Sequence, residues 1–143
     1  MSKSNTFEDD LLKLIFNGTP IANLADNAVA SPLTALYIAL HTADPGEAGQ
    51  QNTNEVAYTG YSRVSVVRTT GGWTILNGSV SPNAAIEFGE MTAGTPGTAM
   101  FATVGTHATG GGKVLYRGAL TPAVAYNVGV QPKIRTTTTI SED

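Results

Sequence analysis

The sequence contains no cysteine. Disulfide frameworks and thiolate metal sites are therefore excluded, and the fold depends on packing and hydrogen bonds. A chain of 143 residues is long enough for this, because it buries roughly 68–70% of its extended surface on folding. We expect a single domain over residues 1–143 that holds no cofactor.

Charge is scarce as well. Charged residues make up 13% of the chain, the net charge is −3, and no run of Lys or Arg occurs. Because nucleic-acid binding depends on clustered positive charge, we expect no nucleic-acid partner. A surface poor in charge favours association, which indicates that much of it contacts other protein.

Long apolar runs are missing too. The longest fall well short of the about 20 residues that a membrane-spanning helix needs. The N-terminal residues Met1 to Asn5 lack the apolar segment of a signal peptide, and acidic residues follow them directly. We therefore expect no membrane partner and synthesis in a cytoplasm.

Catalytic motifs are not evident. His41 and His107 are the two histidines, and neither lies in a known triad context or near a Gly-x-Ser-x-Gly motif. The glycines at 110–112 are not followed by the Lys-Ser/Thr and helix of a phosphate-binding loop. Paired carboxylates for glycoside hydrolysis stay open, because sequence does not fix their distance. We expect that the protein is not an enzyme.

A metal site can be drawn from four residues of one polar stretch: His41, Asp44, Glu47 and Glu55. The carboxylates, however, lack the regular alternation of a calcium loop, and a single histidine is a poor basis for a zinc site. We therefore expect no metal.

The most informative stretch runs from Leu33 to Thr42. It is a run of large apolar residues broken only by Thr and Ala, and the turn-forming Asp44-Pro45-Gly46 follows it. This pattern predicts a central strand that is buried on both faces. The long polar loop from Asp44 to Asn54 has a length that is often functional.

One short amphipathic helix is expected before this strand, from Thr6 to Asn17, with Thr6 as its cap. Its apolar face is expected to include Phe7, Leu11, Leu14 and Ile15, widened by Leu12 and Phe16. The helix would cover an open end of the sheet. Alternatively, it is an arm that docks on a neighbouring subunit.

Short segments of strand character, separated by Gly, Pro and Asn turns, fill the rest of the chain. Asn77-Gly78 predicts a type I′ hairpin turn between two of them. The expected fold is all-β, a jelly-roll-like β-sandwich of about eight strands over residues 33–140. Besides the central strand, the expected strands are Ser62–Arg68, Trp73–Leu76, Ser79–Ser81, Ala85–Phe88, Ala99–Val104, Lys113–Leu120 and Val128–Ile140, the last interrupted by Pro132.

Several segments resemble a family of small tailed-bacteriophage virion proteins, whose members are often labelled tail fibre proteins. The resemblance lies in Leu36 to Gly49, Asn54 to Val64, Gly71-Gly72-Trp73 and Lys113 to Leu120, and so covers most of the chain. It implies a virion component that is assembled in the cytoplasm of a bacterial host.

Within such a family, small size, β character and low charge favour a capsid decoration, or cement, protein. Similar small jelly-roll proteins bridge capsomers from outside the shell, so the expected partners are the major capsid protein and further copies of this chain, in a homo-dimer or homo-trimer. The alternative is a tail fibre or tail-tip module that binds a bacterial surface receptor.

The expected contact residues lie on the helix, the long loop, the aromatic-rich stretch and the C-terminal strand. Tyr58, Tyr61 and Trp73 could stack on sugars, but core and interface roles are favoured by the small number of aromatic residues. The candidate interface residues are Phe7, Leu11, Asp44, Glu47, Gln50, Gln51, Tyr58, Tyr61, Thr136 and Thr138.

Overall fold

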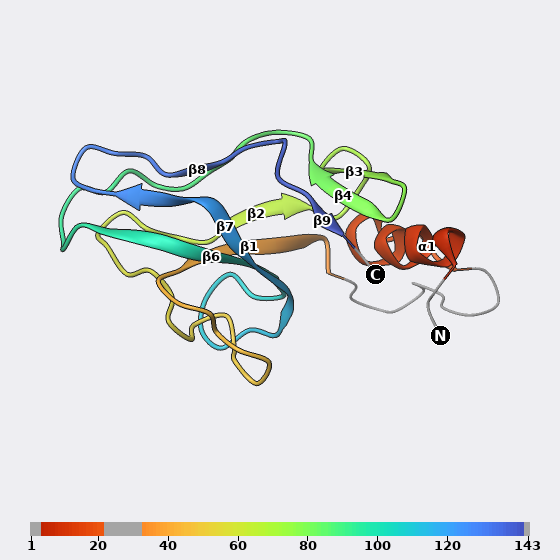
Figure 1. Ribbon diagram of the computed structural model, residues 1–143, viewed down its shortest axis with the longest axis horizontal. Coiled ribbons are helices and arrows are strands. Elements are labelled where there is room, and N and C mark those ends of the chain that lie inside the picture. The colour runs from red at the N-terminus through yellow and green to blue at the C-terminus, as the bar shows by residue number, and fades with distance from the viewer. Residues whose placement is uncertain (1–3, 22–32, 142–143) are drawn as a thin grey trace. The chain divides into compact units, whose positions relative to one another are not determined.

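The structure is a computed structural model that describes residues 4–21 and 33–141, except for the side chains of residues 5 and 7. Over these residues the chain forms one helix and nine strands (Figure 1). This confirms the prediction of an all-β fold with a short N-terminal helix. The elements are α1 (Asn5–Asn17), β1 (Ala35–His41), β2 (Val64–Val67), β3 (Trp73–Leu76), β4 (Ser79–Pro82), β5 (Ile86–Glu87), β6 (Gly97–Gly105), β7 (Val114–Tyr126), β8 (Lys133–Ile134) and β9 (Ile140–Ser141).

The chain divides into two compact units, which are described separately. The first unit takes in residues 1–35, 66–85 and 135–143, and the second takes in residues 36–65 and 86–134. The described strands form sheets of four, three and two strands, with the orders β2-β1-β6-β7, β3-β4-β9 and β5-β8.

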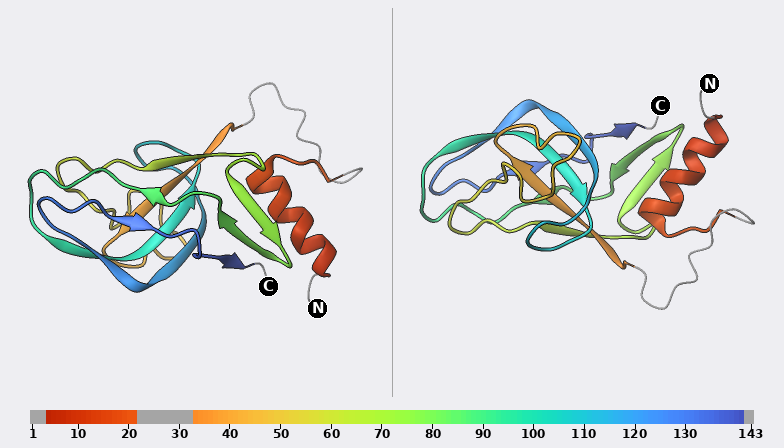
Figure 2. Two further views of the ribbon diagram at one scale, coloured as in Figure 1. Left: turned by 90° about the horizontal axis from the view of Figure 1, so that it is seen from above. Right: turned by 90° about the horizontal axis from the view of Figure 1, so that it is seen from below.

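The first unit is built on the β3–β4 hairpin. Asn77 and Gly78 have φ angles of 52° and 69°, so the predicted type I′ turn is confirmed. Leu76 pairs with Ser79 directly before and after this turn. Helix α1 lies alongside the hairpin in both views of Figure 2, and Asp9 Oδ1 accepts a hydrogen bond from the Gly78 amide.

Helix α1 differs from the prediction in its start and in its buried face. It begins at Asn5, and the amide of Glu8 bonds to the carbonyl of Ser4, so Ser4 and not Thr6 occupies the capping position. Leu12 and Phe16 are fully buried, whereas Leu11 is half-buried. The ring of Phe16 contacts Trp73 edge-on, with centroids 4.7 Å apart, and this contact fixes which face turns inward.

The end of α1 is held by Arg68. Its guanidinium donates to the carbonyls of Leu14 and Ile15, which lie in the last turn of the helix. A cation at a helix C-terminus also interacts favourably with the helix dipole. Burial lowers the pKa of Arg68, but its usual range is so high that the side chain stays charged.

The second unit contains most of the four-stranded sheet. Its strand β1 lies inside the sheet, pairs antiparallel with β6 and is buried from Ile38 through His41. Successive side chains of a strand point to opposite faces, so the predicted burial of the central strand on both faces is confirmed.

Strand β7 is longer than predicted. The expected strand ended at Leu120, yet β7 continues to Tyr126. It passes Pro122, although a proline usually interrupts strand pairing. The register shows how this is possible. Ala99 pairs with Val124 and Phe101 pairs with Ala119, so β7 carries four residues where β6 carries one, and Pro122 lies within this irregular stretch.

The strand expected from Val128 to Ile140, with an interruption at Pro132, does not form as one element. Two strands of two residues each, β8 and β9, replace it. Between them the amide of Thr138 bonds to the carbonyl of Arg135, which makes residues 135–138 a turn. Thr136 and Thr138 are exposed there, so the local turn prevails over the strand propensity of threonine.

Within the described part of the chain, no helix is both long enough and apolar enough to span a membrane.

Candidate functional site

Two polar loops of the second unit form a joint surface, which we call the loop platform: residues 42–55 and 106–113. The first loop is closed at its base by a hydrogen bond of 2.9 Å from the Thr42 amide to the Asn54 carbonyl. The second is closed by a bond of 3.2 Å from the Thr106 amide to the Lys113 carbonyl. The amide of Gln51 bonds to the carbonyl of Gly112 at 2.9 Å, so the two loops are also joined to each other.

Gln51 anchors the platform from inside. Its side chain is fully buried; Nε2 donates to the Tyr37 carbonyl at 3.2 Å and Oε1 accepts from the His107 amide at 2.9 Å. Two glycines make room for it, because a Cβ atom at Gly105 or at Gly112 would lie 2.1 Å from Gln51 atoms. The expected role of Gln51 as a contact residue is therefore corrected, since its side chain does not reach the surface.

Arg63 is the second anchor. Its Nε and Nη2 atoms each lie 2.7 Å from a carboxylate oxygen of Glu55, a paired geometry that gives strong, directional bonds. Nη1 also donates to the His107 carbonyl at 2.8 Å and Nη2 to the Gly110 carbonyl at 2.7 Å. The Arg63 side chain is 2% exposed, so one buried cation fixes both loops.

His41 supports the first loop at the end of β1. Nδ1 lies 2.8 Å from the Thr53 carbonyl and Nε2 lies 2.9 Å from Thr103 Oγ1. A carbonyl can only accept, so Nδ1 carries the proton and Nε2 accepts from the threonine hydroxyl. Burial, the largest influence, lowers the pKa of His41. The ring is a neutral structural link.

The tyrosines of the aromatic-rich stretch face inward. The side chain of Tyr58 is buried, with the residue 6% exposed. Its hydroxyl donates a hydrogen bond to the Gly89 carbonyl at 2.7 Å, and its ring packs on the ring of Tyr126, with the two ring centroids 5.2 Å apart. The Tyr61 hydroxyl donates to Glu55 and accepts from the Leu40 amide, both at 3.0 Å, and burial raises its pKa.

The core role is confirmed for Tyr58 and for Trp73, which is 2% exposed. The expected contact role of Tyr58 is corrected, because its ring is covered.

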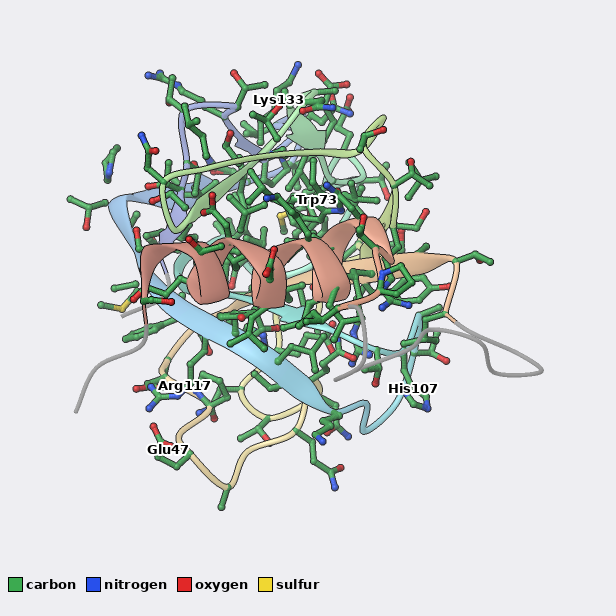
Figure 3. All side chains as sticks on the ribbon, turned by 90° about the vertical axis from the view of Figure 1, so that its right-hand side faces the viewer. Glu47, Trp73, His107, Arg117 and Lys133 are labelled. Atoms are coloured by element: carbon green, nitrogen blue, oxygen red, sulfur yellow. The ribbon has the colours of Figure 1, made fainter. Side chains whose placement is uncertain are left out.

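Asp44 and Glu47 meet Arg117 of β7 at the rim of the platform. Arg117 Nη1 donates to Asp44 Oδ2 at 2.6 Å and Nη2 donates to Glu47; Figure 3 shows Glu47 beside Arg117. The hydrogen bond with Glu47, and the two negative charges, raise the pKa of Arg117. An open pocket of about 380 Å³ lies here, lined by Gly46, Glu47 and residues 114–117.

The exposed side chains of the platform are mainly small and polar. Its exposed positions carry mainly Ala, Thr, Asn, Gln and Gly, and residues 42–55 and 106–113 contain no Phe, Tyr or Trp. An open groove of about 500 Å³ borders it, lined by residues of 55–63 and 108–110. The exposed Gln50 lies in a turn in which its amide bonds to Thr53 Oγ1 at 3.0 Å.

The other candidate contact residues lie elsewhere. Leu11, Thr136 and Thr138 belong to the first unit, while the side chain of Phe7 lies outside what the structure describes. Thus the structure brings together Asp44, Glu47 and Gln50 on one surface, with Gln51 beneath it. Sequence reasoning missed Arg63 and Arg117, because their partners are distant in sequence and no local pattern marks them.

The four residues that were considered as a metal site take part in three separate sets of hydrogen bonds. Asp44 and Glu47 bind Arg117, Glu55 binds Arg63, and His41 binds Thr53 and Thr103. Among the described residues, no group of three or more His, Asp or Glu side chains is placed to hold a metal ion.

His107 is exposed, and its Nδ1 lies 2.7 Å from Thr106 Oγ1. A nucleophile–base pair needs a third group that orients the base. No carboxylate contacts the His107 ring in residues 4–21 and 33–141.

The comparisons with known proteins agree with the resemblance in the sequence. Residues 2–141 match the family described as podophage GP4 fiber I protein gp80. Among the curated proteins there is no match. The family match confirms a phage virion structural protein, with a label of the fibre type. It extends over nearly the whole sequence, and the chain therefore belongs to the podophage GP4 fiber I protein gp80 family.

Proposed function

We propose that this protein is a non-enzymatic subunit of a bacteriophage fibre and attaches to a neighbouring virion protein through its loop platform. The description of its family as a fiber protein favours the fibre as its location. The observation that supports the attachment surface is the contrast within the platform: its inner polar groups are bonded to one another, while its outer side chains face solvent.

Pre-organisation is the physical reason for choosing this surface. A loop that orders only on binding pays conformational entropy at that moment, and a loop already fixed does not. Arg63 and Gln51 fix the two loops with buried hydrogen bonds before any partner binds. Rigid loops with small polar side chains offer many hydrogen bonds to a partner at low entropic cost.

The composition of the platform favours a protein partner over a glycan. Sugar-binding surfaces commonly use an exposed aromatic ring for stacking, and the two loops have no Phe, Tyr or Trp. The neighbouring Tyr58 is buried. A receptor-binding tip built on this surface would therefore lack its usual stacking group.

Capsid decoration, with the major capsid protein as partner, is the second candidate. It is favoured by the charged content of only 13% and by the lack of heptads or repeats in the sequence, which a long stalk would need. The two candidates share the same mechanism, a buried protein–protein contact, and differ in location and copy number.

The test combines a count of the copies of this protein in each virion with a binding assay on particles that lack it. Quantitative mass spectrometry of purified virions separates a fibre subunit, at a small number of copies relative to the capsid protein, from a decoration protein, at a number comparable to it. For the surface, particles lacking this protein are incubated with purified protein that carries Asn52→Arg and Thr109→Arg, two exposed platform positions.

We expect the double variant to lose binding by at least about tenfold, because two bulky charges at a packed interface prevent close contact. The matched control carries Thr74→Arg and Asn83→Arg, two exposed positions of the first unit, and should bind like the wild type. Equal binding of the platform variant and the wild type would refute the proposed surface.

A further inference from the structure

We propose that Asn77 is a site of spontaneous deamidation and that Asp9 of α1 slows this reaction by holding the amide of Gly78. Asparagine is among the thermolabile residues. It deamidates fastest when glycine follows, because a residue without a side chain lets its amide nitrogen approach the asparagine closely. This inference goes beyond the proposed function and concerns the first unit alone.

The reaction needs only the chain and water. The Gly78 amide nitrogen loses its proton to solvent and attacks the side-chain carbonyl carbon of Asn77. A bond forms between these two atoms, and the side-chain nitrogen leaves as ammonia, which produces a five-membered succinimide ring. One water molecule then opens the ring at either carbonyl, so position 77 becomes aspartate or isoaspartate.

The two reacting groups lie in different surroundings. Asn77 is exposed, whereas Gly78 is buried, and α1 lies alongside the hairpin that contains both (Figure 2). The amide nitrogen of Gly78 donates a hydrogen bond of 2.5 Å to Asp9 Oδ1. The proton that must leave before the attack is therefore held by a side chain of the helix.

The charge of Asp9 opposes the attack as well. A nearby charge of the same sign disfavours the charged form of a group, so the carboxylate raises the free energy of the deprotonated Gly78 nitrogen. The backbone adds a second barrier, because Leu76 pairs with Ser79 on the two sides of the turn. The peptide must rotate out of this pairing before the reacting atoms reach the about 3–3.5 Å that attack requires.

Deamidation would weaken the contact that delays it. Aspartate at position 77 would add a negative charge close to Asp9, and like charges repel. Isoaspartate would add one carbon atom to the backbone between Leu76 and Ser79, which a two-residue type I′ turn cannot accommodate. Either product therefore destabilises the hairpin and its packing against α1.

A second Asn-Gly pair, Asn17-Gly18, lies at the end of α1. Asn17 is half-buried, and its Oδ1 atom is buried. The side chain of Asn77, in contrast, is open to the water that the reaction consumes. We therefore expect Asn77 to be the faster site once the hydrogen bond to Asp9 is removed.

The first experiment follows the folded protein over time at a mildly alkaline pH. Mass spectrometry of its peptides measures aspartate and isoaspartate at positions 77 and 17. Asp9→Ala should deamidate at position 77 at least about tenfold faster than the wild type, because a hydrogen bond to a charged group is lost. Asp10→Ala, the matched control, removes the same charge from the next residue of the helix and should react like the wild type.

The second experiment separates the contact with Asp9 from the intrinsic reactivity of the sequence. In guanidinium chloride, where the fold is lost, the wild type and Asp9→Ala should react at the same rate. Asp9→Asn keeps an oxygen that can accept the hydrogen bond but has no charge, so the folded variant should react at a rate between the other two. Circular dichroism checks that each variant is folded before the incubation.

Three results would overturn the proposal. They are equal rates at position 77 for the folded wild type and Asp9→Ala, an equal acceleration by Asp10→Ala, and faster reaction at Asn17 than at Asn77 in the Asp9→Ala variant. None of them would affect attachment through the loop platform, which is measured by binding to particles.

Discussion

The guanidinium of Arg63 binds both carboxylate oxygens of Glu55 at 2.7 Å, with only 2% of the arginine side chain exposed. This pair, and the two carbonyls that Arg63 also binds, hold residues 106–112 against the rest of the loop platform. The stability of the candidate site therefore depends on one buried cation.

Replacement of Arg63 by alanine is expected to lower the free energy of unfolding by about 3–5 kcal/mol, because a partly buried carboxylate and two carbonyls lose their partner. Chemical denaturation followed by circular dichroism measures this. Arg117→Ala is the control, since it removes a solvent-exposed ion pair and should leave the unfolding midpoint nearly unchanged. Similar losses for the two variants would show that Arg63 is not an anchor.

A pair of glycine variants tests the packing of Gln51. Gly105→Ala should destabilise the protein by about 1–3 kcal/mol, because the new methyl group overlaps a buried side chain that is held by hydrogen bonds at both ends. Gly118→Ala should have little effect, since its Cβ position is open. Thermal unfolding compares the two, and a neutral Gly105→Ala variant would mean that Gln51 moves aside easily.

Stability should fall as the pH is lowered toward about 5, and His41 should account for part of the loss. Burial lowers the pKa of His41 in the folded chain, while in the unfolded chain it is about 6.5. The unfolded state therefore binds the proton first, so the stabilising contribution is full above about pH 6.5 and is lost as the pH falls.

The measurement for His41 is the free energy of unfolding between about pH 7.5 and about pH 5, in the wild type and in His41→Gln. The variant should show a smaller loss over this range, because it has no proton to take up at this position. If both proteins lose the same stability, the titration of His41 does not contribute.

Adjacent leucines of α1 test its buried face. Leu12→Ala is expected to cost about 2–5 kcal/mol, as is usual for a large side chain removed from a core, because Leu12 is fully buried. Leu11→Ala should cost clearly less, since Leu11 is half-buried. If chemical denaturation shows a larger loss of stability for Leu11→Ala than for Leu12→Ala, the helix face predicted from the sequence is the buried one.

Local signals in the sequence were sufficient for several elements. Asn77-Gly78 predicted the hairpin because both residues adopt positive φ angles readily, and the apolar run before His41 predicted a buried strand. The extension of β7 past Pro122 could not be predicted, because it depends on an irregular register with β6. The threonines at 136–139 favour a strand by propensity, yet a turn forms there.

The site was predictable only in part. The polar loop from Asp44 to Asn54 stood out by its length, and Asp44, Glu47 and Gln50 do lie exposed on the platform. Arg117 is 73 residues away from Asp44, and the two are brought together by the fold. Gln51 was expected at the surface as part of the polar loop, and Tyr58 was expected in the core or at an interface. Both side chains are buried and use their polar atoms for internal hydrogen bonds.

The most direct test of the account is a cryo-electron microscopy reconstruction of the virion at the position of this protein. We predict that residues 42–55 and 106–113 lie buried against another virion protein, whichever part of the particle holds the chain. Loops that face solvent, while a different surface of the chain makes the attachment, would contradict the account.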